Sequence, residues 1–139
     1  GRLKPFIDRG DIKIIGATTI QEYEAYMLPD RALARRFYPI GIEEPDEDMT
    51  MKILLGTIPS MEEETQVKNT FNIEETTRLL RILVQLSGKE NQPPGRITRL
   101  PELPLSLLEM AFSYAALNSR KDLAIEDLIL SVRHTNLLS

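Results

Sequence analysis

Only two short segments of this 139-residue chain have the pattern of β-strands, and both lie within residues 1–43. Residues 11–16 (DIKIIG) alternate and then become fully apolar, which is typical of a strand that is covered on both faces. Residues 37–43 (FYPIGIE) are the second candidate, where Pro39 favours a sheet edge or the start of a strand. Because a covered strand needs neighbours on both sides, we expect these two to belong to a sheet larger than this chain supplies.

The rest of the chain has helical patterns, with start and stop signals between them. Thr19 and Glu22 have the spacing of a capping box, and Asp46 and Asn72 are further N-cap candidates. Pro59 is expected to end the helix that Asp46 begins. The expected helical segments are the end of one at 2–8, then 19–28, 31–36, 47–57, 73–87, 103–118 and 125–137.

The composition excludes several classes of site. The chain has no Cys, so it offers no disulfide, no Cys-based metal site and no thiol nucleophile. Its lone histidine, His134, lies on the polar side of the last predicted helix, and we interpret it as a surface residue rather than a metal ligand or part of a triad. No apolar run is long enough to span a membrane. The net charge of −4 gives no general attraction to nucleic acid.

The first 56 residues carry a series of short motifs in a defined order. LKPF at 3–6 is followed by IGATT at 15–19, DRALARRF at 30–37 and EEP at 43–45. In order and spacing they closely resemble the first ATPase domain of the Clp-type AAA+ unfoldases and disaggregases. Residues 57–139 resemble the helical lid of that family more loosely, mainly through RLPELPLSLLEMA at 99–111.

This resemblance implies an α+β fold that is mostly α. Residues 1–45 would be the C-terminal part of the large AAA+ subdomain, with the last two strands of its parallel sheet, and 46–139 the helical lid. The chain contains no GxxxxGK[ST], so it lacks the loop that holds phosphates. In the family that loop and the acidic pair for Mg²⁺ come earlier, so we expect this chain to be a piece of a larger protein.

Two threonines follow the first predicted strand. Ligands of an open parallel sheet sit beyond the carboxyl ends of its strands, which is where Thr18 and Thr19 would lie. In the family the second threonine senses the γ-phosphate, so the resemblance implies that role for Thr19, with Thr18 beside the nucleotide. The alternative is that Thr19 only caps the next helix, which the spacing to Glu22 explains fully.

Arg35 and Arg36 stand next to each other before Phe37. An arginine pair at a helix end is also a common surface feature, because cations are favoured there. The resemblance implies that both are arginine fingers, which enter the ATP site of a neighbouring subunit. A planar, always charged guanidinium suits the charge that develops on a transferred phosphoryl group.

The lid of the family contacts adenine through apolar side chains, and Ile53 and Leu105 match two such positions. Ordinary core packing is the alternative that periodicity alone favours. The chain departs from the family at Glu102 and Leu103, where Asp-Lys is usual, and at Pro104, which replaces a small residue. The cation of that lysine is therefore missing, and Arg99 is one candidate to replace it.

The resemblance implies an ATP-dependent protein unfoldase or chaperone that works as a homo-hexameric ring in the cytoplasm, with ATP and Mg²⁺ as cofactors. Its partners would be neighbouring subunits and protein substrates, with a peptidase left open; no nucleic acid and no membrane are expected. We expect the chain alone to be inactive and to bind no cofactor tightly. The alternative is a non-catalytic AAA+-derived binding or scaffold module.

Overall fold

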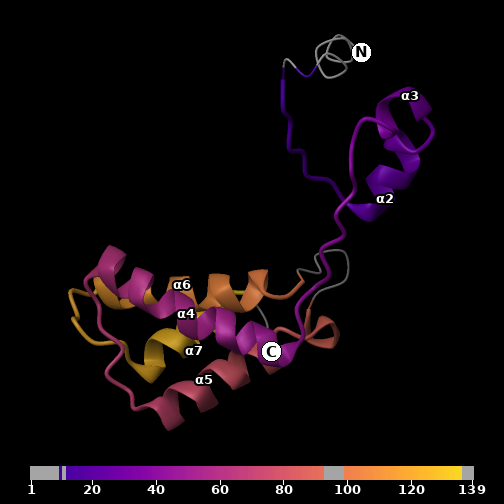
Figure 1. Cartoon of the computed structure of the whole chain (residues 1–139). Coiled ribbons are helices and arrows are strands. Elements are labelled where there is room, and N and C mark those ends of the chain that lie inside the picture. The colour runs from indigo at the N-terminus through magenta and orange to yellow at the C-terminus, as the bar shows by residue number, and fades with distance from the viewer. Residues whose placement is uncertain (1–9, 11, 93–98, 136–139) are drawn as a thin grey trace. The chain divides into compact units, whose positions relative to one another are not determined.

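The computed structural model describes residues 10, 12–92 and 99–135 (Figure 1). The chain divides into two compact units, unit 1 at residues 1–42 and unit 2 at residues 43–139. The helix end predicted at 2–8 and the last residues of the helix predicted to reach 137 lie outside the described residues. None of the helices within the described ranges has the length and apolar character needed to cross a membrane.

The described residues of unit 1 include three short helical elements. They are α2 at Ile20–Glu22, the π-helix η1 at Tyr23–Met27, and α3 at Arg31–Ala34. The prediction of a helix after Thr19 is confirmed, but its second half is wound as a π-helix, with the backbone N–H of Leu28 donating to the carbonyl of Tyr23 at 2.9 Å. Asp30 caps α3, and its Oδ1 accepts from the N–H of Leu33 at 3.1 Å.

The prediction of two parallel strands is wrong for the described part of the chain. Residues 12–19 and 38–46 are extended but form no strand, and the only described bridge of β type is an isolated one between Lys68 and Asp122. The physical reason is the lack of a neighbour, because a strand exists through hydrogen bonds to an adjacent strand. The apolar side chains of these segments are accordingly exposed, Ile15 at 101% and Ile42 at 90% of their surface. The chain is thus helical in its described part, rather than α+β.

Where unit 2 is described, it is a group of four α-helices. They are α4 at Glu47–Thr65, α5 at Ile73–Leu86, α6 at Glu102–Leu117 and α7 at Ile125–His134, with a short 3₁₀ turn, η2, at Lys89–Asn91. Asp46 and Asn72 cap α4 and α5 as the sequence predicts, accepting from the N–H groups of Met49 and Glu75, each at 2.8 Å. The isolated bridge ties the connection after α4 to the connection before α7.

Helix α6 is the centre of unit 2, since it contacts each of the other three helices (Figure 1). A helix covered on several sides must be apolar around most of its circumference, which explains the sequence ELPLSLLEMAFSYAAL. Phe112 is the largest side chain that is completely buried. The buried residues of α6 are Pro104, Leu107, Leu108, Ala111, Phe112 and Ala115.

Helix α4 is longer than predicted, because it continues through Pro59 to Thr65. Proline removes one backbone donor and normally breaks a helix interior, so the sequence favours a stop before it. Ile58 and Met61, on either side of Pro59, are both buried in the core. Their burial requires helical spacing on both sides of the proline, and we infer that this packing outweighs the lost hydrogen bond.

Candidate functional site

Both threonines of the predicted sensor form a hydrogen bond with Glu22. Oγ1 of Thr19 accepts from the N–H of Glu22 at 3.1 Å, and the hydroxyl of Thr18 donates to Oε2 of Glu22 at 3.1 Å. All three residues are exposed. The capping function predicted for Thr19 is therefore present, while the glutamate side chain holds the hydroxyl of Thr18 rather than the backbone of Thr19.

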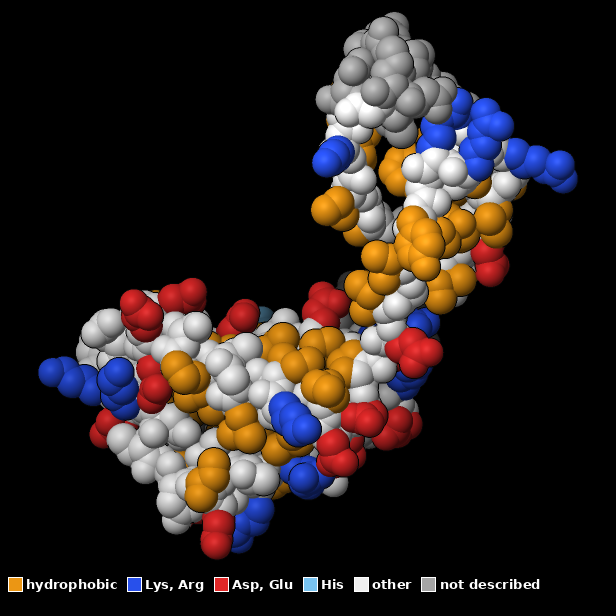
Figure 2. Space-filling view, viewed as in Figure 1, with side chains coloured by type: hydrophobic (Ala, Val, Ile, Leu, Met, Phe, Trp, Pro, Cys, Tyr) orange, Lys and Arg blue, Asp and Glu red, His pale blue; other side chains and the backbone are white. Residues whose placement is uncertain are grey.

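The arginine pair lies at the end of α3, where the two side chains differ. Arg35 is the C-cap residue and is exposed. Arg36 is half-buried, and its Nη1 donates to the carbonyl oxygen of Ala32 one turn earlier on the same helix. Figure 2 shows Lys and Arg side chains gathered over α3, the basic part of unit 1. Thr18, Thr19, Arg35 and Arg36 all belong to unit 1.

The two predicted base contacts, Ile53 and Leu105, belong to unit 2, where they lie on the adjacent helices α4 and α6. Both are half-buried, and Leu105 packs against the core of the unit. Leu105 therefore serves packing in part, as the alternative interpretation holds, and both side chains leave apolar surface uncovered. Arg99, the candidate for a replacement cation, is exposed.

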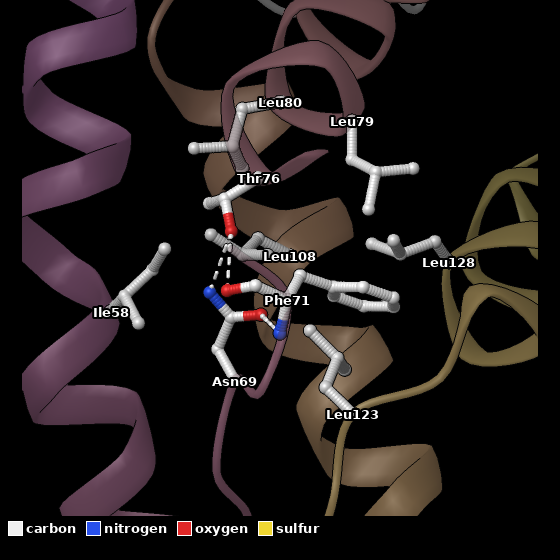
Figure 3. Close-up of a pocket in the computed structure, with 9 residues that line it drawn as sticks. All are labelled: Ile58, Asn69, Phe71, Thr76, Leu79, Leu80, Leu108, Leu123 and Leu128. Carbon is white, nitrogen blue, oxygen red and sulfur yellow. Dashed lines mark hydrogen bonds between the residues drawn. The ribbon is translucent and has the colours of Figure 1, made fainter. Parts of the chain in front are cut away.

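The pocket at the core of unit 2 is too small for a ligand. Figure 3 shows this cavity, whose volume is about 10 Å³, about the space that one water molecule needs. Its polar corner is a closed network in which Nδ2 of Asn69 donates to Oγ1 of Thr76 at 3.0 Å, and Thr76 donates to the carbonyl of Phe71 at 3.4 Å. The lining residues are Ile58, Asn69, Phe71, Thr76, Leu79, Leu80, Leu108, Leu123 and Leu128. We interpret it as a packing gap.

Sequence reasoning did not find the ion pair between Arg120 and Asp127. The side chain of Asp127 is completely buried, and its carboxylate accepts from Nη1 of Arg120 at 2.9 Å, from Nη2, and from the N–H of Ala124 at 2.8 Å. The hydrogen bond to Asp127 raises the pKa of Arg120 above its ordinary value. This pair fixes the start of α7. An acid at the third position of a predicted helix that has no Ser, Thr, Asp or Asn cap was the signal available in the sequence.

A second contact missed from sequence joins Glu44 to Leu100, 56 positions apart. Oε1 of Glu44 accepts from the N–H of Leu100 at 2.8 Å. No cluster of three or more His, Cys, Asp or Glu side chains suited to a metal ion occurs within residues 10, 12–92 and 99–135.

Comparison with known proteins gives several relatives of one kind, although no protein-family model matches the chain. The chaperone protein ClpD1, chloroplastic, of Oryza sativa subsp. japonica is 38% identical over 117 residues, 84% of this chain and 11% of that protein. The chaperone protein ClpB of Aquifex aeolicus is 47% identical over 66 residues, 48% of this chain and 7% of that protein. The ATP-dependent Clp protease ATP-binding subunit ClpA homolog of Trieres chinensis is 49% identical over 61 residues, 44% of this chain and 7% of that protein.

The longest of these alignments covers 117 residues, so it extends beyond the motifs at residues 3–45. The chain belongs to the Clp-type AAA+ ATPases. It spans about a tenth of the length of the relatives that it matches.

Proposed function

We propose that this chain is the part of an ATP-dependent Clp-type chaperone that supplies a phosphate sensor, two arginines for a neighbouring ATP site, and a helical lid. The observation that carries the proposal is the run DRALARRF, which forms α3 and its C-terminal turn in a chain whose relatives are named Clp chaperones. ATP with Mg²⁺ is the cofactor of this proposal.

The arginine pair is the catalytic part of the proposal. Asp30 anchors the first turn of α3, so Arg35 and Arg36 project from a defined helix end rather than from a loose loop. Phosphoryl transfer spreads negative charge over the γ-phosphate oxygens, and a fixed guanidinium there is worth roughly 10³–10⁵ in rate. Because Arg36 already donates to its own helix, the guanidinium of Arg35 is the one that turns outward more readily. Arg36 would have to give up its hydrogen bond to a backbone carbonyl in order to donate to a phosphate.

Hydrogen-bond chemistry favours Thr19 over Thr18 as the sensor. A hydroxyl has one donor and two acceptor positions. Capping uses an acceptor position of Thr19 and leaves its O–H available for a phosphate or a water molecule. The O–H of Thr18 already donates to the carboxylate of Glu22, and this hydrogen bond would have to break before Thr18 could donate elsewhere. Thr19 can therefore cap α2 and sense a phosphate at the same time.

The lid part of the proposal assigns Ile53 and Leu105 to the adenine base. Their half-buried apolar side chains lie on adjacent helices, which suits a flat aromatic base. Glu102 and Leu103 give no cation at the turn where the family has a lysine, so base contact here rests on apolar surface, with Arg99 as the nearest exposed cation in sequence.

The proposed partners follow from the same assignment. Arginines that act on a neighbour's nucleotide require an assembly of subunits, for which we propose a homo-hexameric ring. Protein substrates are proposed because relatives are named chaperones, and a peptidase partner remains an option because one relative is named a subunit of the Clp protease. We propose the cytoplasm as the compartment.

The test is the ATPase activity of the full-length protein with Arg36→Ala or Arg35→Ala. We expect turnover to fall by at least about a hundredfold for one of them, with nucleotide affinity changed by less than about threefold, since the group acts in the transition state. Arg133→Ala, at an exposed arginine on α7, is the matched control and should leave turnover unchanged. Normal turnover in both α3 variants would remove the arginine pair from the mechanism.

A non-catalytic scaffold is the second candidate, and the altered turn at Glu102, Leu103 and Pro104 favours it. The buried Pro104 shows that this turn serves packing in the present chain. A scaffold predicts that the full-length protein assembles but does not hydrolyse ATP, even with Arg35 and Arg36 intact. Measurable turnover in the unmodified protein would therefore exclude it.

A further inference from the structure

The contact between Glu44 and Leu100 joins the two places where the base-contacting helices begin. Glu44 stands three residues before α4, with only Pro45 and the cap Asp46 between them. Leu100 stands two residues before α6. The carboxylate of Glu44 accepts from the backbone N–H of Leu100 at 2.8 Å, so a single side chain connects the entries of α4 and α6.

The turn at Leu100, to which Glu44 is hydrogen-bonded, leads directly into the part of α6 that we assign to adenine binding. The N–H of Glu102 donates to the carbonyl of Arg99 at 3.0 Å, and the N–H of Leu105 donates to the carbonyl of Pro101 at 3.1 Å. Leu100 therefore lies in the tight loop turn that comes directly before α6. Leu105 lies on the first helical turn of α6. A displacement of Leu100 would be carried to Leu105 through these two backbone bonds.

The other end of the contact is equally well anchored. Asp46 caps α4 through its Oδ1, which accepts from the N–H of Met49 at 2.8 Å, and the hydroxyl of Thr50 donates to the carbonyl of Asp46 at 2.7 Å. Glu44 therefore extends from a fixed helix entry. The hydrogen bond of Glu44 is exposed to solvent, where water competes for the donor. A carboxylate suits such a position because it is a stronger acceptor than a neutral carbonyl.

We propose that Glu44 is a positioning residue for the nucleotide: its hydrogen bond to Leu100 sets Leu105 on α6 against Ile53 on α4. This inference rests on the proposed base contact of Ile53 and Leu105. Glu44 touches no nucleotide itself. It acts through the Leu100 turn, and its loss lets the two half-buried side chains drift apart without unfolding the helices.

The experiment compares Glu44→Ala and Glu44→Gln in the 139-residue chain by NMR titration with ADP, following the amide of Leu100 and the methyl groups of Ile53 and Leu105. Glutamine keeps an oxygen that can accept from Leu100, whereas alanine removes it. Arg81→Ala is the matched control, since it removes another side-chain hydrogen bond to α4, which Nη1 of Arg81 donates to Oε1 of Glu47 at 2.8 Å.

We expect Glu44→Ala to raise the ADP dissociation constant about fivefold, the effect of one hydrogen bond of ordinary net strength. Glu44→Gln should stay within about twofold of the unmodified chain, and Arg81→Ala should match it, with all variants folded by circular dichroism. An unchanged dissociation constant in Glu44→Ala, or a fivefold loss in Glu44→Gln, would overturn the positioning role. Absence of shifts at Ile53 and Leu105 in the unmodified chain at millimolar ADP would instead refute the base contact, and the inference with it.

Discussion

Replacement of Pro59 by alanine is expected to stabilise unit 2. Pro59 lies within α4, its side chain is exposed, and it has no N–H to donate to the carbonyl of Leu55. Proline in a helix interior costs about 3 kcal/mol relative to alanine. Proline also restricts the conformations of the unfolded chain. The alanine variant loses this restriction, which lowers its free energy of unfolding by about 1 kcal/mol. Because the exposed ring contributes little packing, the net gain is about 2 kcal/mol.

Thermal and chemical unfolding of the chain measure this gain. About 2 kcal/mol corresponds to a rise in Tm of about 10 °C for a domain of this size. Pro59→Gly is the matched variant, because glycine removes the same ring but costs about 1 kcal/mol more than alanine in a helix. If Pro59→Ala is no more stable than the unmodified chain, or if the alanine and glycine variants unfold together, residue 59 is not in a helix interior and the description of α4 is wrong.

Three further predictions concern the core, a cap and the exposed apolar segments. Leu54→Ala, at a completely buried position of α4, should lower the free energy of unfolding by about 2–5 kcal/mol, whereas Ile53→Ala, half-buried beside it, should cost less; denaturant titration compares the two. Asn72→Ala should cost about 1 kcal/mol by the same method, because Glu75 loses the acceptor of its N–H. The exposed Ile15 and Ile42 should drive self-association, so serine at both positions should reduce the concentration dependence of sedimentation; an unmodified chain that sediments as a monomer at every concentration would contradict this.

Local signals in the sequence predicted the helix starts well. Thr19, Asp46 and Asn72 each cap a helix, because a cap depends only on residues three or four positions away. The end of α4 was not predictable in this way. Whether a helix passes through Pro59 depends on burial of Ile58 and Met61, which involves the other helices of unit 2.

The buried face of α5 shows a similar limit. Ile73 and Ile82 are apolar residues of this helix, yet both are exposed, and the polar Thr76 is buried instead. Thr76 is buried because its hydroxyl joins Asn69 and the carbonyl of Phe71, a network that periodicity does not reveal. The predicted strands failed for a related reason, since an apolar pattern at 11–16 cannot supply the neighbouring strand that it requires.

The candidate site was predictable as a set of residues but not as an arrangement. The motifs around Thr19 and around Arg35 and Arg36 are continuous in sequence, so the resemblance points to them directly. The contact between Glu44 and Leu100 spans 56 positions and has no local signature. The pair Arg120 and Asp127 depends on how α7 begins, and an acid at the third helical position is only a weak signal for it.

The structure of the assembled full-length protein with bound ATP tests the central proposal most directly. We predict that a guanidinium of Arg35 or Arg36 lies about 2.7–2.9 Å from a terminal phosphate oxygen held by the adjacent subunit, the spacing of a charge-assisted hydrogen bond. Both side chains directed into solvent, remote from every nucleotide in the assembly, would contradict it.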